Sequence, residues 1–379
     1  MALDNDKKVD RESIKKIAGL DPAFAYDNDN MFSVEGFLKP KENEIYAAPK
    51  FYGMEDFDFV DSGSSENLLN GRSNKWCVRV NGKMYFSDLI QEIKNNSKSS
   101  YGTCFTTEEY LEDNIPEYFS VIIKQPQDKE FRDSEVFASR ILNYFGVPVV
   151  YNRAINKSFA KRGSEYFLMS VDFLRKNERF IKLCDIMNYP ELKDIKRLSV
   201  YGTKNVVDGI VSTLEKTLSF LNIDVNKKEM DALKKDLVYS ILVRYVLLAD
   251  SDYRNGNSGF LYNVNTKSIR SAPNFDMEEI FNGGFVSSRG IGEERFKELE
   301  IICNEYPEIY CDFITKLASI LKKDKKGVSK LQKLAYSAYE NKDFAEWVIE
   351  SFENCANKIK NNTNEILQKQ SEESGSGLE

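Results

Sequence analysis

The stretch that decides the fold is VLLADSDYRNGNSGFLYNVNTKSIRSAPNFD, residues 246–276. An apolar helix end breaks into a polar loop that contains Asp252 and Asn257. Two short strand-like runs then form a predicted hairpin, which returns the chain to Asp276. Two carboxylates and an amide in this order are the groups that phosphotransferases place around a metal-bound triphosphate. We therefore expect a phosphate-transfer site in this stretch, with Asp252 near the attacking hydroxyl.

The spacing within the polar loop supports this interpretation. In kinases the loop acid precedes the metal-binding amide by five positions, and Asp252 precedes Asn257 by the same number. The alternative is an Asx-rich turn that caps neighbouring backbone, because Asp and Asn favour such turns. We assign Asp250 to that alternative, as a cap at the start of the loop.

Length and composition bound the class of protein. A chain of 379 residues exceeds what one hydrophobic core usually serves, so two lobes are expected. Hydrophobic residues make up 41% and charged residues 30%, which is typical of a soluble globular protein. The net charge of −7 argues against a surface that grips nucleic acid or an anionic membrane throughout, so no direct nucleic-acid binding is expected.

Some mechanisms and locations are excluded by what the sequence lacks. No run of eighteen apolar residues exists and the start is charged, so we expect no transmembrane segment, no secretory signal and a cytoplasmic protein. The six cysteines form no C-x-x-C pair, which favours reduced thiols. Histidine is absent, so acid–base chemistry must use carboxylates, Lys, Tyr or Cys.

A lysine and a glutamate stand out before the central stretch. Glu135 falls on the apolar stripe of a predicted helix, Glu130–Phe145, and a buried carboxylate requires a partner. The candidate partner is Lys124, at the end of the predicted strand Tyr118–Lys124. The alternatives are a Glu135 side chain at the edge of the stripe and a Lys124 side chain in solvent.

Further residues suit a bound nucleotide. Lys75 follows a loop rich in Ser, Gly and Asn and precedes a predicted hairpin with an Asn81-Gly82 turn, so it could contact phosphates. Phe167 and Met169 lie in the predicted strand Glu165–Ser170, where soft apolar side chains could meet adenine. The alternatives are an exposed loop for Lys75 and core positions for Phe167 and Met169.

Beyond Ser170 the pattern is helical apart from the hairpin in the central stretch. The predicted helices are Ser199–Leu221, Lys227–Leu248, Glu293–Glu305, Glu308–Lys322, Ser329–Glu340 and Asp343–Leu367. We expect four parts: an N-terminal extension packed on the first lobe (1–60), a β-rich nucleotide-binding lobe (61–170) with an insertion (87–116), a helical lobe (171–369) and a tail of linker composition (370–379).

Taken in order, four stretches resemble the HipA-like kinases, a bacterial serine/threonine kinase family that includes toxin–antitoxin kinases. These stretches are VIIKQP with Lys124, EVFASRILNYFGVPVV with Glu135, LLADSDYRNGNSGFL with Asp252 and Asn257, and SAPNFDMEEIF with Asp276. The resemblance covers about residues 118–285 and implies an α+β fold of the two-lobed protein-kinase-like type, with a β-rich N-lobe and a helical C-lobe.

The resemblance also implies roles for these residues. Asp252 would orient the substrate hydroxyl or accept its proton, and Lys124, held by Glu135, would neutralise phosphate charge. Asn257 and Asp276 would hold Mg²⁺ against ATP, and the acceptor would be a protein hydroxyl. An antitoxin is the further partner that such a family suggests. Because all of these groups are present, an active enzyme is expected.

Two departures from the family pattern keep alternatives open. The loop reads Asp252-Tyr253-Arg254, with Arg254 where the family has histidine, and Gly71–Lys75 matches the family's glycine-rich phosphate loop only loosely. One alternative is a lipid or small-molecule kinase of the phosphoinositide 4-kinase-like type. Another is a catalytically dead nucleotide-binding module that acts by binding a partner.

Overall fold

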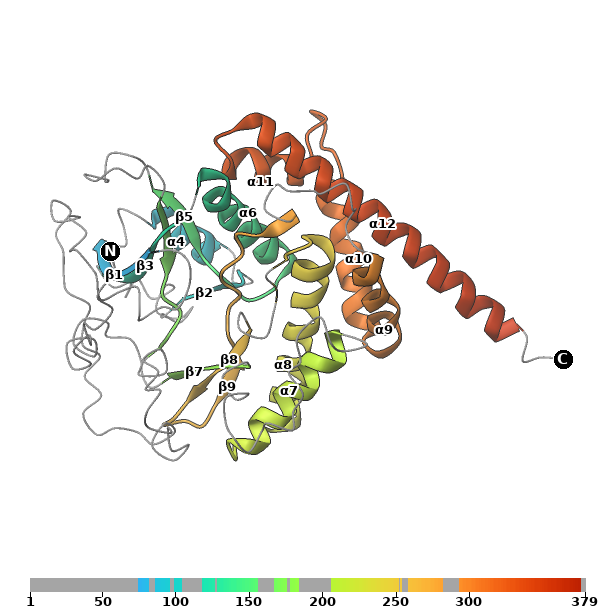
Figure 1. The fold of residues 1–379 in the computed structure, drawn as a ribbon, viewed down its shortest axis with the longest axis horizontal. Helices are drawn as coiled ribbons and strands as arrows, with labels where there is room; N and C mark the ends of the chain where they lie inside the picture. Colours follow the sequence, from blue (N-terminus) through green and yellow to red (C-terminus); the bar gives the residue numbers. More distant parts are fainter. Residues whose placement is uncertain are drawn as a thin grey trace, which may run out of the picture. The chain divides into compact units, whose positions relative to one another are not determined.

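The computed structural model describes part of the chain, which is drawn in colour in Figure 1. The described residues are 74–81, 86–95, 99–103, 118–126, 128–155, 167–175, 178–183, 206–251, 253, 258–281 and 293–375. The predicted N-terminal extension over residues 1–60 lies outside these ranges, as do residues 82–85 of the predicted Asn81-Gly82 hairpin and the two loop residues Asp252 and Asn257.

The fold mixes helices and small sheets, and its contacts divide the chain into two compact units. We call them the strand-rich unit and the helical unit. The strand-rich unit contains the residues up to Lys129, Val150–Ile181 and Leu261–Ile269; the helical unit contains Glu130–Val149, Lys182–Phe260 and the residues from Arg270 onward.

A four-stranded sheet forms the centre of the strand-rich unit. Its strand order is β1-β3-β6-β5, with every neighbouring pair antiparallel. The predicted strands before and after the glutamate helix are confirmed by β3 and β6. The strands are β1 (Asn74–Asn81), β3 (Tyr118–Gln125), β5 (Asn152–Ile155) and β6 (Phe167–Val171).

Aromatic side chains pack beside this sheet. Phe86 and Phe119 stack with ring centroids 5.6 Å apart, and Tyr151 meets Phe86 edge-on. The hydroxyl of Tyr151 donates to Asp88 at the start of a short helix. This contact joins the short helix to the residue before β5. The smaller elements here are α4 (Ser87–Asn95), β2 (Tyr101–Gly102), β4 (Val149–Val150) and β7 (Glu178–Lys182), and β2 pairs with β4.

The helical unit contains most of α6 (Lys129–Phe145), the predicted glutamate helix, which the structure confirms. Two later helices begin with a capping box, made by Asn226 with Glu229 and by Ser329 with Gln332. In Figure 1, α9 and α10 lie beside the long α12. The further helices are α7 (Val206–Phe220), α8 (Lys227–Ser240), α9 (Lys297–Glu305), α10 (Pro307–Leu321), α11 (Lys330–Ala338) and α12 (Lys342–Gly375).

The predicted helix Lys227–Leu248 changes its winding before the polar loop. It is α-helical to Ser240 and then continues as a π-helix, Ile241–Leu247. Leu248 N–H accordingly reaches back five residues, to the carbonyl of Val243. Such π segments are rare and are found mostly at functional sites. The apolar periodicity could not predict this change, because it marks the buried face and not the hydrogen-bond register.

The predicted hairpin after the polar loop is confirmed. Its strands are β8 (Gly259–Asn263) and β9 (Ile269–Ser271), closed by a hydrogen bond from Asn263 N to Ser268 O of 2.9 Å. The expectation that all further structure after Ser170 is helical is wrong, because β7 (Glu178–Lys182) adds a third strand in the order β7-β8-β9. A short polar segment such as ERFIK shows too little alternation to be recognised as a strand.

The last helix runs further than its sequence suggests. Its predicted end is Leu367, yet α12 continues to Gly375 and so enters the predicted tail. None of the described helices is long and apolar enough to cross a membrane.

Candidate active site

A buried arginine organises the region around the polar loop. Arg244 lies in the π-helix, and its Nε donates to Asp250 Oδ2 at 2.9 Å while Nη2 donates to the same oxygen. Its Nη1 donates to Asn274 Oδ1 at 3.3 Å and to the carbonyl of Phe275 at 3.2 Å. Its Nη2 also donates to the carbonyl of Asp276 at 3.2 Å. The guanidinium therefore joins the start of the polar loop to the backbone of the predicted metal acid.

These contacts compensate the buried positive charge of Arg244. Arg244 and Asp250 are both fully buried, and an unpaired buried charge costs several kcal/mol. The ring of Tyr253 lies 5.0 Å from the guanidinium carbon and adds a cation–π contact. Burial raises the pKa of Tyr253, which keeps its phenol protonated. Asp250 is thus the partner of a buried arginine, and its prediction as a simple loop cap is incomplete.

Hydrogen bonds tie the start of the loop to the segment after Asp276. Ser251 N donates to the carbonyl of Glu279 at 3.2 Å, and Ser251 Oγ donates to the Glu279 carboxylate at 2.8 Å. Phe281 N donates to the carbonyl of Leu248 at 2.8 Å. The loop and the acid-bearing segment therefore form one connected piece.

The backbone of this piece is strained at three points. Ala249, Asp276 and Phe281 have φ angles of 48°, 57° and 50°. The left-handed region is unfavourable for residues other than Gly, and Asp tolerates it better than most. Such conformations persist only where surrounding contacts enforce them, and they gather at functional sites.

Asn274 fixes the other side of the same segment. Its N–H and its Nδ2 both donate to the carbonyl of Pro148 at 2.8 Å, and Ser240 Oγ donates to its Oδ1 at 2.6 Å. The side chain of Asn274 is 6% exposed, so these bonds are shielded from water. The residues before Asp276 are therefore held by Ser240 of α8 and by Pro148, which follows α6.

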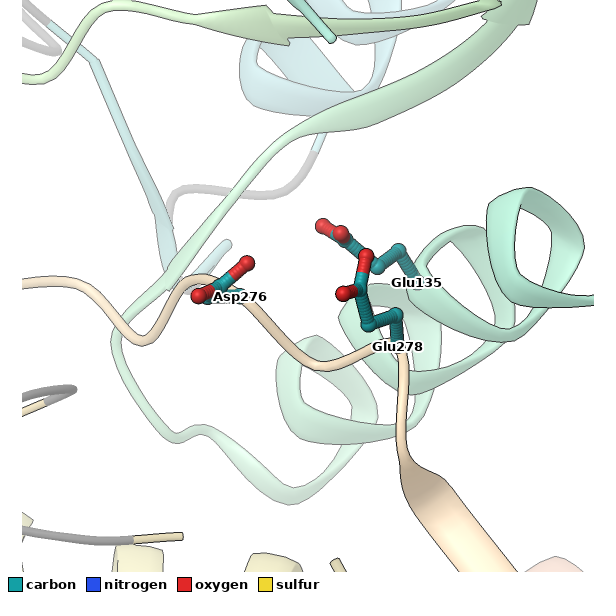
Figure 2. A group of neighbouring side chains, drawn as sticks. All are labelled: Glu135, Asp276 and Glu278. Atoms are coloured by element: carbon teal, nitrogen blue, oxygen red, sulfur yellow. The ribbon is translucent and has the colours of Figure 1, made fainter. Parts of the chain in front are cut away.

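Three carboxylates converge beside this framework. Glu135 on α6 and Asp276 and Glu278 on the segment after β9 have oxygens that all lie within 4.8 Å of one another. Figure 2 shows Glu135 projecting from its helix toward the extended segment that carries the other two. We call these residues the carboxylate group. Carboxylate oxygens are the ligands that Mg²⁺ prefers, and a cation would offset their mutual repulsion, so the residues present fit a divalent metal.

The structure therefore brings together two of the predicted site residues, Glu135 and Asp276. Glu135 is 3% exposed, which excludes the alternative of a side chain at the edge of the stripe. Sequence reasoning missed Glu278 and Arg244. Arg244 had a detectable signal, because a single arginine inside the apolar run ILVRYVLL must find a buried partner. For Glu278 the only sequence signal was its position two residues after Asp276.

The predicted nucleotide residues lie on the sheet of the strand-rich unit. The β1–β3 register places Lys75 directly opposite Lys124. Lys124 is 5% exposed, so the solvent alternative for this lysine is wrong. Phe167 and Met169 are also buried, at 3% and 1% exposed, as the alternative of core positions requires. Their contact with adenine stays a prediction, as do the roles of Asp252 and Asn257, which lie outside the described residues.

Comparison with known proteins gives matches among solved structures. No family model and no curated protein matches the sequence. The Helicobacter pylori proinflammatory kinase CtkA is similar with a TM-score of 0.43 and 14% identity, over 66% of this chain and 88% of that one. HipA from Shewanella oneidensis MR-1, in a complex with HipB and operator DNA, gives a TM-score of 0.35 and 13% identity, over 65% of this chain and 60% of that one. These two neighbours are a kinase and a HipA protein.

Proposed function

We propose that this protein is an ATP- and Mg²⁺-dependent HipA-like serine/threonine protein kinase, which transfers the γ-phosphate to a protein hydroxyl. The observation that carries the proposal is the Arg244 network, which fastens the start of the loop of Asp252 to the backbone of Asp276. Phosphoryl transfer depends on positioned charges and needs little covalent chemistry from the protein. A rigid connection between catalytic loop and metal acid is what this reaction requires.

Each predicted residue has one task in the proposed reaction. Asp252 accepts the proton of the substrate hydroxyl as the new P–O bond forms and the bond to ADP breaks. Lys124 offsets the charge of the phosphates, and Lys75 contributes from the neighbouring strand position. Asn257 and Asp276 hold the metal, with Glu278 and Glu135 close by. Bound Mg²⁺ neutralises the charge that develops on the phosphate oxygens.

The test follows label from γ-labelled ATP onto the protein itself and onto a generic protein acceptor, in the presence of Mg²⁺. The parent is compared with Asp276→Asn, which removes one carboxylate charge and keeps the shape, and with Asp231→Asn on the exposed face of α8 as a control. We expect label with the parent and the control and none with Asp276→Asn.

Other outcomes would point to the alternatives. Label on a phosphoinositide and not on protein would indicate a lipid kinase. Thermal stabilisation by ATP and Mg²⁺ without any label would indicate a nucleotide-binding module. Absence of both would contradict the kinase proposal.

An antitoxin partner belongs to the same proposal. The HipA structure contains HipB, and the family resemblance implies a comparable partner for this chain. Growth arrest on expression of the parent, absent with Asp276→Asn and relieved by the neighbouring gene, is the expected result. Normal growth with an enzyme that is active in vitro would remove the toxin role and leave the kinase proposal intact.

A further inference from the structure

The middle of α6 is buried on all sides although it contains several polar residues. Every residue from Arg132 to Ser139 is buried, including Arg132, Asp133 and Glu135. Arg132 pairs with its own neighbour, since Nη2 lies 2.7 Å from Asp133 Oδ1. Burial raises the pKa of Asp133 and the arginine beside it opposes that shift. Such a helix needs partners from outside itself, because buried polar groups are costly when they lack hydrogen bonds.

Those partners come from the turn between α11 and α12. Glu340 N donates to Asp133 Oδ2 at 3.2 Å, and Arg132 Nη2 donates to Glu340 Oε1 at 3.1 Å. Tyr339 Oη donates to Ser134 Oγ at 3.0 Å. We call residues 337–347 the α11–α12 junction. They comprise the last residues of α11, the turn after it and the first residues of α12. The junction therefore holds the residues immediately before Glu135.

A chain of aromatic rings continues from this contact through the junction. Phe137 on α6 meets Tyr339 with centroids 5.7 Å apart, and Tyr339 meets Phe344 at 5.3 Å. Phe344 meets Trp347 at 5.0 Å, and Trp347 meets Phe281 edge-on at 6.2 Å. Aromatic pairs at these separations attract one another beyond the area that they bury.

Phe281 ends the segment that carries two of the three carboxylates. Its φ of 50° is unfavourable, so the surrounding contacts hold it in place: the hydrogen bond from its N–H to Leu248 O and the contact of its ring with Trp347. The junction thus touches α6 beside Glu135 and touches the far end of the segment that begins at Asp276. Both sides of the carboxylate group rest on the same junction.

We propose that the α11–α12 junction positions the carboxylate group, with Tyr339 holding α6 and Trp347 holding the segment from Asp276 to Phe281. Tyr339 and Trp347 are positioning residues that act through Glu135 and Asp276 and touch no substrate. The inference rests on the proposed function, because it assigns the junction a role in holding the catalytic metal. It gives α11 and α12, which lie beyond the stretch that resembles HipA-like kinases, a role in positioning the metal ligands.

The experiment measures the affinity of the protein for Mn²⁺ in the absence of nucleotide. Binding is followed by the electron paramagnetic resonance signal of the ion. Tyr339→Phe removes one buried hydroxyl, and its matched control is Tyr310→Phe, which removes the hydroxyl bonded to Thr363 on another helix pair. Trp347→Leu removes the ring against Phe281, and its matched control is Phe352→Leu, a fully buried position of α12 outside the aromatic chain.

We expect Tyr339→Phe and Trp347→Leu each to weaken Mn²⁺ binding about tenfold, as loss of a supporting contact does at metal sites. Trp347→Phe should restore most of the affinity. The two controls should lose thermal stability and keep the parent's affinity. In hydrogen exchange, the amides of residues 131–138 and 276–281 should exchange faster together in Tyr339→Phe, a change too small to unfold the protein.

Three results would overturn the inference: Mn²⁺ affinity unchanged in both junction variants, an equal loss in the controls, or no Mn²⁺ binding by the parent. Faster exchange confined to α11 and α12 would also overturn it. Failure of the proposed function looks different. If the parent binds Mn²⁺ and the junction variants lose it while no label is transferred from ATP, the positioning role stands and the kinase activity does not.

Discussion

Arg244 and Asp250 form an ion pair in which neither side chain has any solvent exposure, between the π-helix and the first residue of the polar loop. The same guanidinium reaches the carbonyls of Phe275 and Asp276. One side chain therefore sets the distance between the two parts of the central stretch that the proposed chemistry needs together. Arg244 also contacts the ring of Tyr253, which belongs to the same loop.

Arg244→Met should destabilise the fold strongly. The substitution leaves Asp250 buried without its cation, and breaking a buried pair in this way costs about 3–5 kcal/mol. Urea unfolding of the parent and the variant measures the change. Arg153→Ala, which breaks a half-exposed pair with Asp88, should cost less than about 1 kcal/mol. Equal costs for the two variants would contradict the central role of Arg244.

Glu278→Gln should weaken metal binding without unfolding the protein. The substitution removes one of three carboxylates whose oxygens lie within 4.8 Å, and the cation loses one charged ligand. A Mn²⁺ titration should show a loss of about tenfold or more. Glu353→Gln, on the exposed side of α12, is the control and should bind as the parent does. Unchanged affinity in Glu278→Gln would contradict the prediction and remove Glu278 from the metal site.

Asp236→Asn should stabilise the protein at neutral pH. Burial raises the pKa of Asp236 on α8, and its contacts with Ser271 and Lys235 oppose the shift only in part. Because the folded pKa is above the unfolded one, the protonated form is favoured by folding. This contribution to stability is full below the unfolded pKa and is lost as pH rises through the folded pKa.

The measurement for Asp236 is the melting temperature of the parent and the variant from about pH 4 to about pH 8. The variant should gain over the parent toward the upper end of this range. Asp231→Asn on the same helix has an exposed side chain and serves as the control. A constant difference across the range would show that Asp236 does not act through its titration.

Lys267→Gly should stabilise the β8–β9 hairpin. Lys267 has a φ of 59° and an exposed side chain, so glycine relieves the left-handed backbone at little loss of packing. We expect a gain of up to about 1 kcal/mol in the free energy of unfolding, because the relief of strain exceeds the added chain entropy. Asn265→Gly in the same turn, where φ is not left-handed, should lower stability instead. A gain in both variants would mean that flexibility alone is responsible.

Periodicity predicted the elements that position the site. The steps between apolar residues placed Glu135 on the buried side of α6, and β-branched residues marked β3, which ends beside Lys124. The hairpin after the polar loop was readable because two apolar runs flank turn residues. These features depend on neighbours within a few positions of one another, and the sequence contains that information directly.

The sequence by itself determined the order of the predicted site residues along the chain: a lysine at the end of a strand, a glutamate on a helix, a loop with Asp252 and Asn257, and an acid at Asp276. Only the tertiary structure decided which groups meet. Glu278 joined the carboxylates, Arg244 joined Asp250 to Asp276, and Tyr339 reached Ser134 across 205 positions of the chain. The physical reason is that local patterns fix a side chain's face on its own element, whereas its partner depends on packing between distant elements.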